Sequence, residues 1–92
     1  MSFLEELRQH YIHTKIVILK VILNQIVEQY PALKDSMEIR RNKLKINNDL
    51  CKCYIDLEGG EFKICIDGYT PNYYEDFESV LTEIEDEIAS NE

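Results

Sequence analysis

The sequence predicts one small α+β domain in the order α-β-β-β-α, with a three-stranded antiparallel meander and both helices packed on one face of the sheet. Three observations lead to this prediction. A long first segment repeats apolar residues at helical spacing, a central segment alternates apolar and polar residues around a Gly-Gly pair, and a last segment returns to helical spacing. The chain of 92 residues is long enough for one domain, 1–92, near the lower size limit for independent folding.

Residues 2–30 are predicted to form one long helix. Ser2 and Glu5 fit a capping box, in which each side chain accepts a hydrogen bond from the other's backbone N–H. Pro31 ends the helix, because the residue before a proline avoids helical angles. A strand over 15–23 is the competing interpretation, since this part is rich in Ile and Val. The core stripe of the helix repeats at spacings of four and three and consists of Ile12, Ile16, Leu19, Leu23, Ile26 and Tyr30.

This helix is too long for a compact domain of 92 residues. At ~1.5 Å per residue it measures about 40 Å, whereas the domain would be roughly 30 Å across. We therefore expect it either to protrude straight or to kink within residues 10–14. A second apolar stripe lies beside the first and consists of Leu4, Leu7, Tyr11, Ile18 and Ile22. If the helix stays straight, we expect Leu7, Tyr11, Ile18 and Ile22 to form the interface of a possible homodimer or to contact a bound partner.

Residues 37–67 are predicted to form the sheet. The pair Gly59-Gly60 supplies the positive φ angles of a two-residue hairpin turn and so sets the register of residues 51–67. This register places Leu57 opposite Phe62, Ile55 opposite Ile64, Cys53 opposite Ile66, Asp56 opposite Lys63 and Lys52 opposite Asp67. The last two pairs are expected to attract each other across the strands.

The first strand needs an interruption. Met37 and Ile39 have the opposite parity from Leu44 and Ile46, so a bulge or break is expected at residues 40–42. The second helix is predicted to span residues 72–89, with Thr70 or Asn72 as its N-cap and Pro71 near its first position. Its buried stripe contains Phe77, Leu81, Ile84 and Ile88.

The charge of the chain is concentrated at its C-terminal end. All ten Lys and Arg residues lie in the first 63 positions with nine carboxylates, whereas the last 29 residues carry nine carboxylates and no base. Tyr73 and Tyr74 are adjacent, so they cannot both face the core of one helix. This acidic and aromatic segment is predicted to bind a basic surface of a partner protein through Tyr73, Tyr74, Glu75, Asp76, Glu78, Glu83, Glu85, Asp86 and Glu87. The alternative is a solvated face that only keeps the protein soluble.

Other candidate sites are weaker. The basic segment Arg40, Arg41, Lys43 and Lys45 is expected to pair with the acidic helix or to protect an edge strand. Cys51 and Cys53 put both sulfurs on one strand face, and His10 and His13 are the nearest candidates for further ligands, but packing in the core is favoured over a metal site. No catalytic constellation is apparent, so we expect no enzyme, no cofactor and no metal. Three cysteines without disulfide-like spacing and no signal peptide or membrane span suggest a cytoplasmic protein.

Two resemblances follow from these residues. The element order resembles that of double-stranded RNA-binding domains, but where those domains begin their last helix with a basic motif this chain has Tyr74, Glu75 and Asp76, so direct nucleic-acid binding is not expected. In composition and architecture the chain resembles small acidic inhibitors encoded by phages, anti-CRISPR proteins among them. Residues 73–78 and 83–87 carry this resemblance, which implies that the nucleic-acid path of a host defence protein is blocked.

The sequence therefore predicts a non-enzymatic protein-binding module, an acidic inhibitor that covers a basic surface of its partner. The alternative is a dimeric adaptor, immunity protein or chaperone-like interaction protein that assembles through the long first helix.

Overall fold

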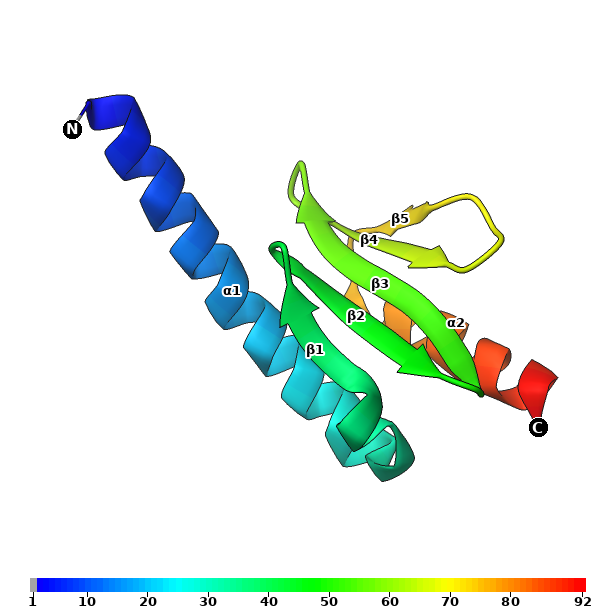
Figure 1. Cartoon of the computed structure of the whole chain (residues 1–92). Coiled ribbons are helices and arrows are strands. Elements are labelled where there is room, and N and C mark those ends of the chain that lie inside the picture. Colours follow the sequence, from blue (N-terminus) through cyan, green and yellow to red (C-terminus); the bar gives the residue numbers. More distant parts are fainter. Residues whose placement is uncertain (1) are drawn as a thin grey trace.

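A computed structural model describes residues 2–92 and arranges them in two layers (Figure 1). One layer is a five-stranded antiparallel sheet. The other consists of two helices, α1 (Phe3–Gln29) and α2 (Phe77–Asn91), which both lie on the same face of that sheet. A short 3-10 helix, η1 (Pro31–Ser36), follows α1. The α+β class is as predicted, but the sheet has five strands and not three.

The strands follow one another in space in the same order as in the sequence. They are β1 (Met37–Arg40), β2 (Lys43–Asn48), β3 (Cys51–Glu58), β4 (Glu61–Ile66) and β5 (Asn72–Tyr74). The expected break at residues 40–42 is a hairpin turn, in which Arg41 and Asn42 have φ angles of 54° and 61°. Positive φ at both central residues suits a tight turn between antiparallel strands. This turn divides the predicted first strand into β1 and β2.

The β3–β4 hairpin has the predicted register. Gly59 and Gly60 adopt φ angles of 60° and 81°, and Ile55 lies opposite Ile64. The predicted pairing of Asp56 with Lys63 was wrong at the level of the side chains, although their backbones are paired. Lys63 instead contacts Glu58 at 3.2 Å. Asp56 contacts Lys15 of α1 at 2.5 Å, so this carboxylate connects the first helix to the centre of the sheet.

The start of the second helix was predicted too early. Residues 72–74 form the edge strand β5, in which Asn72 lies opposite Ile64 of β4. The helix begins at Phe77, and its N-cap is Asp76, whose carboxylate accepts a hydrogen bond from the backbone N–H of Ser79 at 3.1 Å. Adjacent tyrosines favour an extended conformation at a sheet edge, which explains the strand. Neither Thr70 nor Asn72 caps α2.

One hydrophobic core lies between the sheet and the two helices. Its α1 half is formed by Leu19, Ile22 and Ile26, and its α2 half by Val80 and Ile84. The sheet contributes Leu44, Ile46, Cys51, Cys53, Ile55 and Ile64. Helix α1 covers β1 and β2, whereas α2 covers β3, β4 and β5. The register of β1 against β2 brings Met37 and Ile39 to the same face as Leu44 and Ile46, so the β1–β2 turn places four apolar side chains against α1.

Helix α1 is continuous and extends well beyond the sheet (Figure 1). The kink considered at residues 10–14 does not occur, and neither does the strand considered at 15–23. The molecule measures 50 × 25 × 21 Å, and every residue from 2 to 14 is exposed. We call residues 3–14 the overhang. Within residues 2–92, no helix has both the length and the apolar character that a membrane crossing requires.

Candidate protein-binding surfaces

The outward side of α2 carries exposed carboxylates. Because Val80 and Ile84 are buried against the sheet, positions 78, 85 and 86 point away from it. Glu75 is exposed just before the N-cap. We call Glu75, Glu78, Glu85 and Asp86 the acidic face. Within residues 2–92 the ion pairs are Lys15–Asp56 and Lys63–Glu58, so none of these four carboxylates is neutralised by a contact inside the described chain.

Two other residues predicted to bind a partner are used inside the molecule. The Tyr74 hydroxyl donates a hydrogen bond to Oε1 of Glu83 at 2.6 Å, and Nδ2 of Asn72 donates to the same oxygen at 2.5 Å. The hydrogen bond to Glu83 raises the pKa of Tyr74 to about 12. The second oxygen of Glu83 is buried without a hydrogen-bond partner. Glu83 therefore links β5 to α2 through hydrogen bonds. It is not one of the exposed carboxylates of the acidic face.

Two further predicted residues have local roles in α2. Asp76 caps the helix and also accepts a hydrogen bond from the Ser79 hydroxyl at 2.9 Å. Oε1 of Glu87 accepts a hydrogen bond from the side-chain amide of Asn91 at 2.9 Å. Both carboxylates are oriented by neighbours on their own helix, which leaves Tyr73 as the remaining candidate from the predicted set.

Tyr73 is exposed on the edge strand. Its ring centroid lies 5.8 Å from the Lys63 ammonium, on the opposite parity from Tyr74. Tyr69 is also exposed, in the connection between β4 and β5. Exposed tyrosines provide contact area at a small entropic cost and are enriched in protein interfaces. The structure thus separates the two adjacent tyrosines, with Tyr73 available for contact and Tyr74 bound to Glu83.

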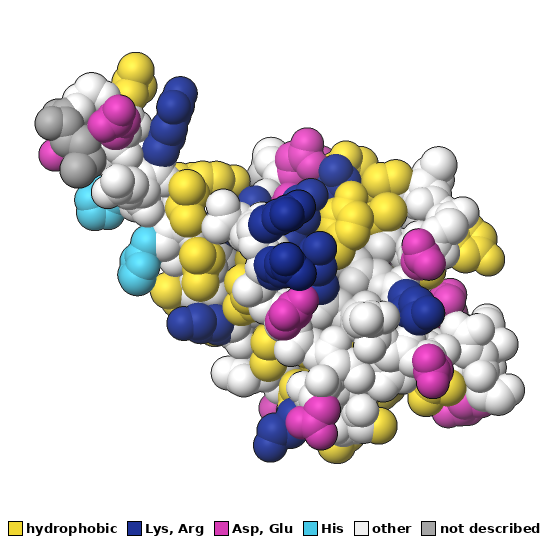
Figure 2. Space-filling model, viewed as in Figure 1, with side chains coloured by type: hydrophobic (Ala, Val, Ile, Leu, Met, Phe, Trp, Pro, Cys, Tyr) yellow, Lys and Arg dark blue, Asp and Glu magenta, His cyan; other side chains and the backbone are white. Residues whose placement is uncertain are grey.

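A basic cluster lies on the β1–β2 hairpin, away from α2. Figure 2 shows Lys and Arg side chains gathered over this hairpin on the sheet face that the helices leave open. The cluster comprises Arg40, Arg41, Lys43 and Lys45, and the Lys43 ammonium lies 4.7 Å from the centroid of the Tyr54 ring. The expected pairing of this segment with the acidic helix is wrong for the described residues, because no ion pair joins them.

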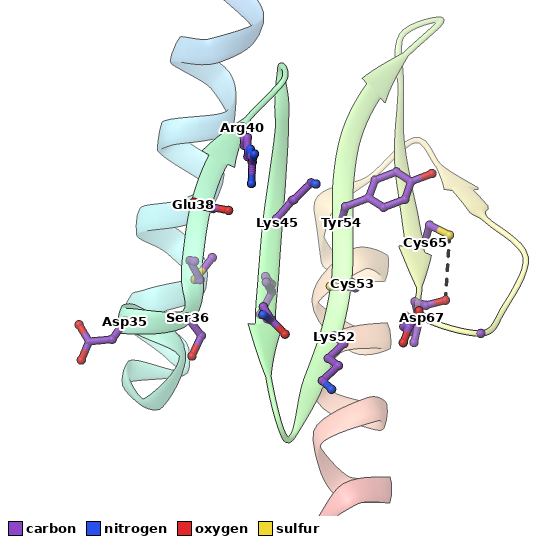
Figure 3. Close-up of a pocket in the computed structure, with 15 residues that line it drawn as sticks. Asp35, Ser36, Glu38, Arg40, Lys45, Lys52, Cys53, Tyr54, Cys65 and Asp67 are labelled. Carbon is purple, nitrogen blue, oxygen red and sulfur yellow. Dashed lines mark hydrogen bonds between the residues drawn. The ribbon is translucent and has the colours of Figure 1, made fainter.

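A depression of about 690 Å³ lies beside the basic cluster on the open face of the sheet (Figure 3). Arg40, Lys45 and Lys52 line it together with Tyr54. Carboxylates from Asp35, Glu38 and Asp67 line it as well. The two signs of charge are mixed within one hollow, so the depression has no strong preference for an anionic ligand.

Two of the three cysteines belong to the core, whereas Cys65 is half-buried on the open face of the sheet. Cys51 and Cys53 are buried, and their sulfur atoms lie 3.8 Å apart. The hydrogen bond with Cys51, together with burial, raises the pKa of the Cys53 thiol, so it stays protonated. His10 and His13 are exposed on the overhang. In the part of the chain that the structure describes, no three His, Cys, Asp or Glu side chains converge as metal ligands.

The second stripe of α1 is exposed over most of its length. Leu4, Leu7, Tyr11 and Ile18 are exposed, whereas Ile22 is buried in the core of its own chain. The assignment of Ile22 to an interface was therefore wrong. Helical spacing alone does not show on which side of the helix the sheet lies. Ile22 is at the edge of the second stripe that adjoins the core stripe, and the sheet covers it. Val21 is exposed on the outward side and was missed, although it continues the same heptad spacing.

Comparisons with protein-family models, curated proteins and solved structures found no match. The function of the chain is therefore inferred from its own surfaces. Two of them have no internal explanation, namely the acidic face on α2 and the apolar side of the overhang.

Proposed function

We propose that the chain is a non-enzymatic protein-binding module that places its acidic face on a basic surface of a partner protein. One observation carries the proposal: Glu75, Glu78, Glu85 and Asp86 are exposed and form no ion pair within residues 2–92. The basic cluster that was expected to neutralise them lies on the open face of the sheet. The negative charge is thus available to another molecule.

The position of Glu85 and Asp86 supports this role. Both lie in the C-terminal half of α2, where the helix dipole disfavours negative charge. Unlike Asp76, neither side chain caps the helix, and unlike Glu83, neither bonds to another element. Carboxylates that stabilise nothing in their own chain are suited to contact the Lys and Arg residues of a partner. Exposed Tyr69 lines a small hollow together with Glu87 of α2 and can add contact area on that side.

The mechanism is electrostatic competition. A protein surface that binds nucleic acid gains much of its affinity from Lys and Arg residues on phosphates. Carboxylates held on a rigid helix can occupy those cations and exclude the polyanion. The net charge of −8 accelerates the encounter with such a surface and disfavours direct binding to nucleic acid. This is the action of a small cytoplasmic inhibitor of the phage anti-defence or anti-CRISPR type, and it requires no cofactor.

The test is a charge reversal with a matched control. The tagged chain is used to isolate its basic partner, and the purified pair is titrated at low and at high salt. We expect the double variant Glu85→Lys/Asp86→Lys to weaken binding by at least ~100-fold at low salt, because close charge pairs across an interface are worth several kcal/mol in favourable cases. The control, Glu5→Lys/Glu6→Lys, makes the same change of net charge on the exposed overhang. Equal weakening by both variants, or an affinity that does not change with salt, would contradict the proposal.

A second candidate function is an interaction protein, such as an adaptor, an immunity protein or a chaperone-like protein, that assembles through α1. The exposed apolar side of the overhang favours it, because monomeric proteins rarely leave a long apolar row in water. The two candidates use different surfaces and respond differently to salt, since apolar contacts do not weaken as ionic strength rises.

A further inference from the structure

One row of α1 stays exposed along the whole overhang and beyond it. Leu4 is 67% exposed, Leu7 48%, Tyr11 58%, Ile18 39% and Val21 55%. Thr14, also exposed, occupies the remaining place in the row. We call these six residues the outer seam. Their spacings alternate between three and four, which is the heptad pattern of helices that pair side by side. Figure 2 shows apolar side chains at several points along the protruding helix.

The overhang lacks the packing that normally stabilises a helix. Residues 3–14 are all exposed, so they bury no apolar face against the sheet. The overhang continues a helix that is already formed, so it does not incur the cost of nucleation, but it gains none of the tertiary packing that supplies most helical stability in proteins. Ser2 accepts a hydrogen bond from the backbone N–H of Glu5 at 3.3 Å, which caps the helix but covers none of its apolar side chains. A continuous overhang is thus best explained by a surface that covers the outer seam.

We propose that the outer seam is covered by the outer seam of a second copy of this chain, in antiparallel orientation. In this arrangement Leu4 meets Val21 of the second copy, Leu7 meets Ile18, and Tyr11 meets Thr14. The proposal specifies the geometry of the second candidate function and does not depend on the acidic face.

The spacing of the outer seam makes it complementary to itself. Its six positions are symmetric about a point between Tyr11 and Thr14, so two antiparallel copies align all of them at once. The largest side chain of the seam, Tyr11, then lies against its smallest member, Thr14. None of the six residues carries a charge, so the pairing buries no unpaired ion.

The distribution of charge favours a second copy in this orientation. Helix α1 is neutral overall, with Glu5, Glu6 and Glu28 balanced by Arg8, Lys15 and Lys20, so the remainder of the chain carries the net charge of −8. Contact along α1 therefore joins two neutral surfaces. An antiparallel pair keeps the two negative bodies at opposite ends of the helices, whereas a parallel pair would bring them side by side. A membrane surface is a poorer occupant, because helices that lie on membranes carry Lys and Arg on their polar face, and the overhang has Glu5 and Glu6 against Arg8 alone.

The first test measures the oligomeric state by sedimentation equilibrium over a range of concentrations. We expect a monomer–dimer equilibrium that Leu7→Asp weakens by at least ~100-fold, because each dimer would bury two unpaired carboxylates. Gln9→Asp is the matched control, since Gln9 is exposed on another side of the same overhang and gains the same charge. Leu7 lies outside the core, so the unfolding midpoint of the variant should equal that of the wild type at a concentration low enough for the wild type to be monomeric. A wild-type chain that remains monomeric at high concentration, or a dimer that Leu7→Asp leaves intact, would overturn the proposal.

The second test establishes the orientation by disulfide crosslinking. Leu4→Cys and Val21→Cys are made separately in a Cys65→Ser background, since Cys51 and Cys53 are buried. In the antiparallel pair, residue 4 lies next to residue 21 of the second copy and about 25 Å from residue 4 of that copy. A mixture of the two variants should form a mixed disulfide, and neither variant should crosslink to itself. Self-crosslinking of Leu4→Cys would show a parallel pair and refute the proposed orientation. A dimer that fails to form leaves the acidic face untouched, so failure here is distinguishable from failure of the inhibitor proposal.

Discussion

The two helices differ in the kind of side chain that they expose to the solvent. Helix α2 buries Val80 and Ile84 against the sheet and exposes carboxylates to the solvent. Its buried and exposed sides are therefore those expected of a helix on the surface of a monomer. Helix α1 reaches the core only in its second half, through Leu19, Ile22 and Ile26, and that half also leaves Ile18 and Val21 exposed. Its first half has no inward side and turns apolar residues to the solvent. The comparison shows that α2 exposes charge and α1 exposes apolar area, and these two exposed surfaces are the basis of the two proposals above.

The two halves of α1 should differ most in their response to truncation. Leu19→Ala removes a fully buried side chain, and we expect it to lower the free energy of unfolding by about 4 kcal/mol. Leu4→Ala removes a side chain from the overhang and should change the stability of the monomer by less than ~0.5 kcal/mol. Urea unfolding at low protein concentration measures both. A large loss from Leu4→Ala would mean that the overhang packs on its own body, which would remove the contrast between the halves.

The ion pair between Lys15 of α1 and Asp56 of β3 should have the next largest effect on stability. The Lys15 and Asp56 side chains are 13% and 11% exposed and 2.5 Å apart. Lys15→Met would leave the Asp56 carboxylate buried without its cation, so we expect a loss of about 3 kcal/mol. Lys63→Met is the control, because its partner Glu58 is 56% exposed and such surface pairs contribute little. Thermal unfolding of both variants tests this, and equal losses would show that burial does not distinguish the two pairs.

Much of the fold was predictable because local chemistry sets it. Gly59-Gly60 determined the β3–β4 register, and the periodicity of residues 3–29 identified the long helix. The turn at Arg41 and Asn42 was expected only as an interruption, because Asn42 favours positive φ but Arg41 does not, and the hairpin is set by the pairing of β1 with β2. Strand β5 was missed because three residues carry no periodicity, so its conformation depends on the edge of β4.

The candidate sites were predictable in type but not residue by residue. Composition located the negative charge in the last part of the chain, yet only the structure shows that Glu83 bonds to Tyr74 whereas Glu85 is exposed. The spacing of α1 indicated two stripes, but the side that packs on the sheet is decided by tertiary contacts. Ile22 was consequently placed at an interface, although it lies in the core. The Lys15–Asp56 pair joins residues far apart in sequence, so no local pattern indicated it.

The hydrogen bond between Tyr74 of β5 and Glu83 of α2 should make a moderate contribution to stability, and this contribution should depend on pH. Tyr74→Phe removes the hydrogen bond to Glu83, and we expect a loss of about 1.5 kcal/mol at neutral pH. The pKa of Tyr74 is raised from 10.0 to about 12, so the folded state holds this proton more tightly than the unfolded state. The stability that this hydrogen bond contributes is complete below pH 10 and disappears as the pH rises towards 12. Unfolding of wild type and variant across this range should converge at high pH, and a constant difference would contradict the assignment.

The smallest effect on stability is expected where the proposed effect on binding is largest. Glu85→Ala and Asp86→Ala remove carboxylates from the C-terminal half of α2, where the helix dipole disfavours them. Their stability should therefore be equal to that of the wild type or higher by up to ~0.5 kcal/mol, measured by thermal unfolding at low salt. Asp76→Ala serves as the contrast on the same helix, because loss of the N-cap should cost about 1 kcal/mol. If Glu85→Ala destabilised the fold as much as Asp76→Ala, Glu85 would have an internal role and would no longer support recognition of a basic partner.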